Sequence, residues 1–214
     1  CVVILRSTGK AFCAGHDLKQ MQSARSHQDN GFDYYNKLFD QCSKVMLQIK
    51  NLPKPVIAEV QGVATAAGCQ LVATCDIAVA SKIAKFGVNG VNIGLFCSTP
   101  MVALSRNIGR KKSFEMLVTG DFMTALEAKE NGLINHVTSK QMLSDKTNEI
   151  AAKISDKFSR VVKIGKEAFY NQAEMNLKDA YHYTAKVMAR NMVLGETIEG
   201  VSAFIEKRTP EWIE

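Results

Sequence analysis

Three short runs of β-branched and small apolar residues restrict the chain to an α/β fold. They read CVVILRS at residues 1–7, VIAEV at 56–60 and DIAVAS at 76–81. Each run predicts a buried strand, and the first is expected to be buried on both faces. Segments with apolar residues at helical spacing separate the strands. Strands that alternate with helices predict an α/β core.

The segments between the strands predict one long helix and two loops. Apolar residues at helical spacing predict a helix over residues 32–49, which Pro53 and Pro55 end because proline cannot continue a helix. Residues 7–20 are expected to form a turn-rich loop, and residues 85–96 a loop punctuated by glycines.

The second half of the chain reads as helical. Thr124 with Glu127 and Thr138 with Gln141 have the spacing of a capping box, which predicts a helix start at both places. Two apolar stripes at helical spacing follow, and such stripes are typical of core or subunit contacts. Their members are Leu143, Ile150, Ile154 and Phe158, and then Leu177, Tyr181, Met188 and Met192.

Composition excludes several classes of partner. The 214 residues carry a net charge of +6, but the lysines and arginines are scattered, which argues against a nucleic-acid partner. No stretch approaches the roughly 20 apolar residues of a membrane span. The six cysteines form no metal-type spacing, so we expect reduced thiols, no metal site and a reducing compartment.

A run of small residues after the second strand predicts a site for a negatively charged oxygen. Ala66, Ala67 and Gly68 have almost no side-chain bulk, so a ligand can approach their backbone closely. A helix that begins here presents unpaired N–H groups at the positive end of its dipole. The turn FCAGHD at residues 12–17 can aim a second N–H group at the same point.

These two segments together resemble the crotonase (enoyl-CoA hydratase/isomerase) family. FCAGHDL and GVATAAGCQL are similar to the family patterns FxAGxDL and GxxxGGGxxL. The likeness extends over nearly the whole chain, through residues 75–81, 85–87, 117–137 and 203–210. The resemblance implies a ClpP-like spiral core of ββα units at residues 1–136 and a helical trimerisation region at 137–214. It also implies that the N-terminal part of the family fold precedes this chain.

The resemblance further implies a ligand and the residues that contact it. The ligand is a coenzyme A thioester, with no other cofactor. The backbone N–H groups of His16 and Ala67 would form the oxyanion hole. A homotrimer or hexamer in the mitochondrial matrix is expected, with any transit peptide outside this chain. The residues expected to line the coenzyme A site are Ala14, Lys19, Gly68, Phe204 and Lys207.

Two departures from the family pattern affect the expected chemistry. The two glutamates of a hydratase correspond to Gln70 and Gly90, and neither residue can exchange a proton near neutral pH. Losing one such group typically costs about 10²–10⁴ in rate, so efficient hydration or isomerisation is not expected. Four other side chains are each better explained by a structural role: Glu59, Asp17, Asp76 and Cys97.

Four alternatives for the activity remain open, and one of them is a slow hydratase or isomerase that uses a water molecule oriented by Gln70. A non-enzymatic acyl-CoA-binding or scaffold protein needs only the ligand site. A malonyl-type decarboxylase fits because the AGHD sequence at His16 is similar to the methylmalonyl-CoA decarboxylase branch, where the histidine holds a substrate carboxylate; otherwise His16 is only tolerated at a loop tip. A weaker resemblance links Gly90, after Val88 and Asn89, to dihydroxynaphthoyl-CoA synthases that bind bicarbonate there.

Overall fold

The computed structural model describes residues 1–212. Contacts within the chain divide it into a larger and a smaller compact unit. The larger unit comprises Val3–Leu52 and Val56–Ala151, and the smaller one Cys1–Val2, Pro53–Pro55 and Ala152–Glu214. The functional division expected at residues 136 and 137 stays a prediction.

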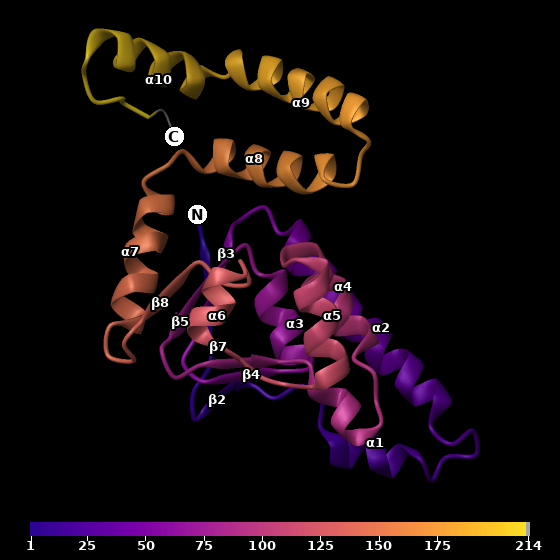
Figure 1. Ribbon diagram of the computed structural model, residues 1–214. Coiled ribbons are helices and arrows are strands. Elements are labelled where there is room, and N and C mark those ends of the chain that lie inside the picture. The colour runs from indigo at the N-terminus through magenta and orange to yellow at the C-terminus, as the bar shows by residue number, and fades with distance from the viewer. Residues whose placement is uncertain (213–214) are drawn as a thin grey trace. The chain divides into compact units, whose positions relative to one another are not determined.

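The first sheet of the larger unit is wholly parallel (Figure 1). Its strands lie in the order β1 (Val3–Arg6), β3 (Val56–Val60), β5 (Ile77–Ser81) and β8 (His136–Thr138). Every residue of β3 is buried, as expected. The expectation for β1 is wrong, because this edge strand has a neighbour on one side only and its residues are half-buried or exposed.

A second sheet is built from strands of two or three residues. Its order is β2 (Ala11–Cys13), β4 (Val63–Thr65), β6 (Lys85–Gly87) and β7 (Met123–Thr124), with only β7 antiparallel to its neighbour. β2 and β6 lie in segments that were expected to be loops, because strands this short show no recognisable alternation. Consecutive strands such as β3 and β4 enter different sheets before a helix follows, which is a ββα unit.

Helices pack against these sheets in the larger unit, where α3 contacts α2 and α4 and α4 contacts α5 (Figure 1). The core that they enclose includes Val60, Val72, Phe86, Leu104 and Met116. The helices are α1 (Leu18–Ala24), α2 (Phe32–Asn51), α3 (Ala67–Thr74), the 3₁₀-helix η1 (Asn89–Ile93), α4 (Ser98–Asn107), α5 (Arg110–Thr119), α6 (Ala125–Glu130) and α7 (Leu143–Ser155).

Of the two predicted helix starts, one is confirmed and one is wrong. Thr124 and Glu127 form the reciprocal capping box that begins α6. Thr138 instead ends β8, and the side chain of Ser139 accepts a hydrogen bond from the backbone N–H of Met142 before α7 begins. Pairing with β5 decides the conformation of Thr138, which the local spacing could not show.

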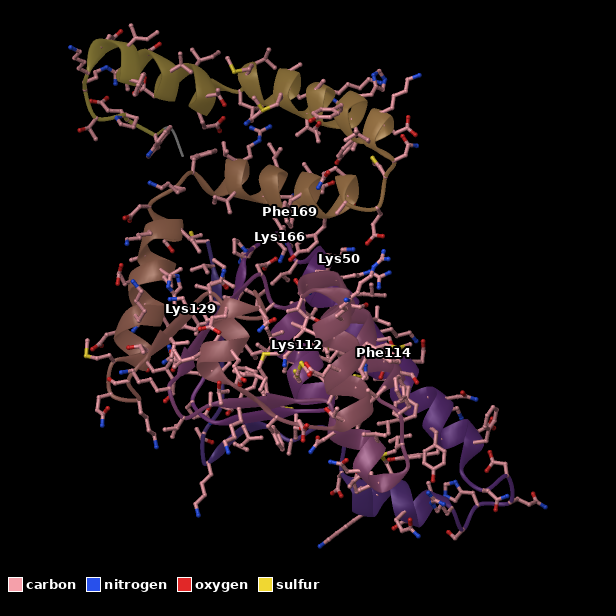
Figure 2. The ribbon with its side chains drawn as sticks, in the orientation of Figure 1. Lys50, Lys112, Phe114, Lys129, Lys166 and Phe169 are labelled. Carbon is pink, nitrogen blue, oxygen red and sulfur yellow. The ribbon has the colours of Figure 1, made fainter. Side chains whose placement is uncertain are left out.

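The smaller unit contains α8 (Ser159–Gln172), α9 (Leu177–Met192) and α10 (Gly195–Glu206), with α8 against α9. Lys166 on α8 (Figure 2) donates a hydrogen bond from Nζ to the carbonyl of Lys54 at 3.0 Å, which joins two pieces of this unit. Phe158 caps α8 and faces Trp212, so its expected place in the stripe of α7 is wrong.

The second predicted stripe lies on α9 and is exposed within this chain. Leu177 and Tyr181 are 74% and 71% exposed, and Met188 and Met192 are more than half exposed. The stripe is therefore not core within the chain, and a subunit contact stays a prediction. No helix in the described residues is long and apolar enough to cross a membrane.

Candidate oxyanion site

The start of α3 lies directly on the end of β2, and Gly68 permits this approach. A Cβ atom at Gly68 would lie 2.0 Å from the carbonyl oxygen of Cys13 and 2.8 Å from its Cβ. Both distances are shorter than real Cβ contacts, so any side chain at residue 68 would push the helix off the strand. Glycine at this position is therefore what lets the two small-residue segments meet.

The same contact brings the loop of His16 to Ala67. Gly15 has a φ of +91°, a left-handed conformation that favours glycine. A Cβ atom at Gly15 would lie 3.1 Å from the Cβ of Ala66 and 3.4 Å from the backbone nitrogen of Ala67. The two backbone N–H groups expected to form an oxyanion hole, those of His16 and Ala67, thus belong to adjoining segments.

Ala66 sets the direction of α3 with a strained backbone. Its φ of 50° and ψ of −120° are uncommon for a residue with a side chain. The strain is held by hydrogen bonds at both ends: the N–H of Ala66 donates to the carbonyl of Gly87 at 2.9 Å, and its carbonyl accepts from the N–H of Gln70 at 3.1 Å. The carbonyl of Ala66 therefore accepts the first helical hydrogen bond of α3.

The N–H groups of Ala67 and His16 donate to no other group within residues 1–212. The N–H of Ala67 also lies at the positive end of the α3 dipole. Unpaired donors on a preorganised backbone are what an oxyanion hole requires, because they need no rearrangement when charge develops on the ligand oxygen. The arrangement can polarise a carbonyl.

The imidazole of His16 adds a buried nitrogen to this site. Its ring packs edge-on against Phe39 of α2, with 5.7 Å between ring centroids. Its Nε2 atom is buried and has no hydrogen-bond partner in the described residues. Burial lowers the pKa of His16 below its usual range, because the protonated ring would lose its hydration. The ring is therefore neutral at pH 7.

Gln70, which the family pattern aligns with the first of the two hydratase glutamates, is buried on α3. Its side chain is 4% exposed and lies one helical turn after Ala67. The thiol of Cys42 on α2 donates a weak hydrogen bond to Oε1 of Gln70, with 3.9 Å between sulfur and oxygen. Burial, and to a smaller extent the neighbouring Cys13, raises the pKa of Cys42, which keeps this thiol protonated.

The space beside Gly90, which the family pattern aligns with the second glutamate, is filled. A Cβ atom at Gly90 would lie 2.3 Å from the carbonyl oxygen of Leu95 and 2.9 Å from Sγ of Cys97. The hydroxyl of Thr65, one residue before Ala66, forms a short hydrogen bond with Oδ1 of Asn89. The segment around Gly90 is therefore fixed beside the start of α3 without a side chain.

The other acids considered are engaged in structural contacts. Glu59 forms an ion pair with Arg6 at 3.2 Å and accepts a hydrogen bond from Ser144. Asp17 caps α1 by accepting from the N–H groups of Lys19 and Gln20, which confirms its expected role in bracing the turn.

Asp76 follows the C-cap residue of α3, and its expected role as a structural cap stays a prediction. It accepts a hydrogen bond from the N–H of Val56 at 2.6 Å and so anchors the start of β3. Cys97 is buried at the start of α4, and that burial was expected. The contacts of these four side chains therefore give none of them the role of an acid in the site.

The residues expected to contact coenzyme A fall in both units. Ala14 and Lys19 are exposed beside the His16 loop in the larger unit. Phe204 is 85% exposed at the end of α10, and Lys207 follows it with a φ of 56° in the smaller unit. Their contact with a ligand stays a prediction. Within the described residues, no group of three His, Cys, Asp or Glu side chains is placed to hold a metal ion.

Sequence reasoning missed two residues of α2 that line this site. Phe39 and Cys42 contact His16 and Gln70, respectively. They lie three residues apart on α2 and so share one helix face. That spacing was visible in the sequence, but nothing in it showed which partner this face of α2 would meet.

Comparisons with known proteins identify the family of the chain. The family model for enoyl-CoA hydratase/isomerase matches residues 1–214. The mitochondrial enoyl-CoA hydratase domain-containing protein 3 of Homo sapiens is 47% identical over 211 residues, which are 99% of this chain and 68% of that protein. Its counterpart in Rattus norvegicus is 46% identical, with 99% and 69% covered.

Two solved structures share the fold. A crystal structure of enoyl-CoA hydratase from Mycobacterium smegmatis has a TM-score of 0.94 and 54% identity, and the match covers 99% of this chain and 80% of that one. The crystal structure of human enoyl-CoA hydratase domain-containing protein 3 has a TM-score of 0.92 and 47% identity, covering 99% and 81%. The predicted α/β fold is confirmed.

Proposed function

The chain belongs to the enoyl-CoA hydratase/isomerase family, as its motifs predicted, and from that premise we propose that it binds acyl-CoA thioesters and polarises their carbonyl without being an efficient hydratase. The backbone N–H groups of His16 and Ala67 receive the thioester oxygen. This proposal rests on the approach of Gly15 to Ala67. A Cβ atom at Gly15 would lie 3.4 Å from the backbone nitrogen of Ala67. That contact places the loop that carries one unpaired donor beside the start of α3, which carries the other.

The proposal separates binding from proton transfer. Hydration needs one group that takes a proton from water and one that delivers a proton to the α-carbon. Gln70 can orient a water molecule but cannot accept its proton, and Gly90 has no room for a side chain. Glu59, Asp17 and Asp76 are held by structural contacts. The site therefore keeps the backbone donors that stabilise negative charge and lacks the side chains that transfer protons.

The thioester carbonyl itself is the feature to test. Calorimetric titration of the full chain with butyryl-CoA is compared with the thioether S-butyl-CoA, which differs only in lacking the carbonyl oxygen. Two hydrogen bonds to that oxygen predict that butyryl-CoA binds about tenfold more tightly. Equal affinities would show that the N–H groups of His16 and Ala67 do not receive the oxygen.

The rest of the proposal concerns the coenzyme A moiety and the cellular setting. Ala14, Lys19 and Gly68 would line the path of coenzyme A, and Phe204 and Lys207 would contact its adenine end. A homotrimer or hexamer that acts in fatty-acid metabolism in the mitochondrial matrix would fit the family resemblance. The names of the relatives support the mitochondrial location alone. The exposed stripe on α9 provides a surface for subunit contact.

A second candidate function is decarboxylation of a malonyl-type thioester, which the resemblance of the AGHD sequence at His16 to the methylmalonyl-CoA decarboxylase branch favours. In this reaction the bond between the carboxylate carbon and the α-carbon breaks. Its electron pair moves to the thioester oxygen, which the N–H groups of His16 and Ala67 hold as an enolate. Carbon dioxide leaves, and water protonates the α-carbon, so no protein base is required.

Mass spectrometry of mixtures with methylmalonyl-CoA tests this second function. Formation of propionyl-CoA by the native protein that is weakened in His16→Ala, but not in the control His27→Ala, would support it. His27 is an exposed histidine whose ring contacts Tyr34, remote from the start of α3 in sequence. An absence of propionyl-CoA would rule out decarboxylation of this substrate and leave the binding function untouched.

A further inference from the structure

Gln70 lies where a substituent of a bound acyl chain would pass. Ala67 and Gln70 are three residues apart on α3 and so share one helix face. Three residues of helix rise about 4.5 Å. The three-carbon unit between the two oxygens of a 3-oxoacyl thioester can bridge such a span. A thioester oxygen on the N–H of Ala67 therefore places the third carbon of the acyl chain near Gln70.

One face of α2 holds both polar side chains of the site. The ring of His16 packs on Phe39, and the carbonyl oxygen of Gln70 receives the thiol of Cys42. Since Phe39 and Cys42 lie one turn apart on α2, His16 and Gln70 are neighbours along that face. Burial raises the pKa of Cys42, so its thiol remains a donor at neutral pH.

The contact with Cys42 fixes which end of the amide faces the ligand. The Oε1 atom of Gln70 is occupied by the thiol, while its Nε2 atom meets no acceptor within residues 1–212. The buried side-chain atoms without a hydrogen-bond partner include Nε2 of His16. They do not include Nε2 of Gln70. The amide nitrogen thus reaches accessible space although the residue is only 4% exposed.

We propose that Gln70, oriented by the thiol of Cys42, donates a hydrogen bond to an oxygen on the third carbon of the acyl chain, so that the site selects 3-oxoacyl thioesters over hydrocarbon acyl thioesters. This inference rests on the proposed function, since the thioester must first be held at Ala67. A hydrocarbon chain leaves the amide without an acceptor, and a buried donor left unpaired weakens binding. An ionised glutamate at residue 70 would offer only acceptors and lose the preference.

Calorimetric titration of the full chain with acetoacetyl-CoA and with butyryl-CoA tests the inference. The two thioesters have the same chain length and differ in the oxygen on the third carbon. The native protein is expected to bind acetoacetyl-CoA about three- to tenfold more tightly. In Gln70→Met, which keeps the shape and removes the amide, the ratio of the two affinities is expected to fall to about one.

The role of Cys42 has its own readout. Cys42→Ser keeps a donor toward Gln70 and is expected to preserve the ratio, whereas Cys42→Ala is expected to lower it. Thr74→Val is the control on the same helix, because the hydroxyl of Thr74 donates only to the backbone carbonyl of Gln70. A merely structural effect would weaken both thioesters alike and leave the ratio unchanged.

The possible outcomes separate the two proposals. If the native protein binds both thioesters equally, or if Gln70→Met keeps the preference, the inference is wrong and the thioester-binding function stands. If neither thioester binds, the proposed function fails and the inference fails with it. Should Gln70→Met not fold, the native ratio together with Cys42→Ser and Cys42→Ala still decides the question.

Discussion

Two glycines of the site leave no space for a side chain, and the consequences for function are opposite. At Gly68, the carbonyl of Cys13 lies 2.0 Å from a Cβ position, and this closeness brings together the segments that carry the two proposed oxyanion donors. At Gly90, the carbonyl of Leu95 lies 2.3 Å from a Cβ position, and this closeness removes the room for an acid. Close packing therefore brings the segments of the backbone donors together at Gly68 and excludes an acidic side chain at Gly90.

The largest expected effect is that of Gly68→Ala. The added methyl group would collide with backbone of β2, which cannot move as a flexible side chain can. We expect a loss of about 3 kcal/mol in the free energy of unfolding and no measurable binding of butyryl-CoA. Urea denaturation and calorimetry measure the two effects.

Gly165→Ala is the matched control for that change. Gly165 lies inside α8, and nothing lies within 4 Å of its Cβ position. Alanine there should raise the free energy of unfolding by about 0.5–1 kcal/mol. A Gly68→Ala protein as stable as this control, with binding intact, would show that the approach of α3 to β2 is not needed.

The second effect concerns Gly90→Glu, alone and combined with Gln70→Glu. Restoring both glutamates in sequence should not restore hydration of crotonyl-CoA, because Leu95 and Cys97 occupy the space of the new side chain. We expect a loss of about 2 kcal/mol in stability from Gly90→Glu. A double variant that hydrates crotonyl-CoA rapidly would contradict the claim that the segment around Gly90 is closed to an acid.

A smaller effect is expected at Ala66, between the two halves. Its φ of 50° and ψ of −120° suit glycine better than alanine. Ala66→Gly should therefore raise the free energy of unfolding by about 1 kcal/mol, the relief of strain exceeding the added entropy of the unfolded chain. Ala73→Gly in the regular part of α3 should lower it by a similar amount. Thermal unfolding of both variants distinguishes strain from a general effect of glycine.

The smallest effect is a pH dependence from His16. Burial lowers the pKa of this group in the folded protein, so the unfolded chain takes up the proton first as the pH falls below about 6.5. Stability from the neutral ring is present above that pH and is lost as the pH falls toward the lowered pKa. His16→Gln should flatten the pH dependence of urea midpoints between about pH 7.5 and 5.5. Identical slopes in both proteins would contradict the burial of a neutral ring.

Sequence patterns over a few residues predicted the elements whose structure depends on local interactions. The buried strand β3, the amphipathic α2 and the capping box at Thr124 follow from burial, periodicity and side-chain bonding over a few residues. The strands β2 and β6 were missed because three residues carry no periodic signal, and partner strands alone make them extended.

The site divides in the same way. The small residues Ala66 to Gly68 predicted that a ligand or another segment could approach their backbone closely. In the structure, the loop of Gly15 lies at that point. The crowding at Gly90 and the contact between Cys42 and Gln70 join residues that are distant in sequence or turn on the exact path of a loop. Such contacts depend on tertiary packing, which residue types at single positions do not encode.

Carbonyl polarisation without acid–base catalysis is best tested by incubating the full chain with crotonyl-CoA and following loss of the conjugated double bond. We expect crotonyl-CoA to bind and its hydration not to exceed the rate with Gln70→Met. Rapid hydration by the native protein would show that a proton carrier other than Gln70 and Gly90 acts in the site, and the proposed loss of acid–base catalysis would be wrong.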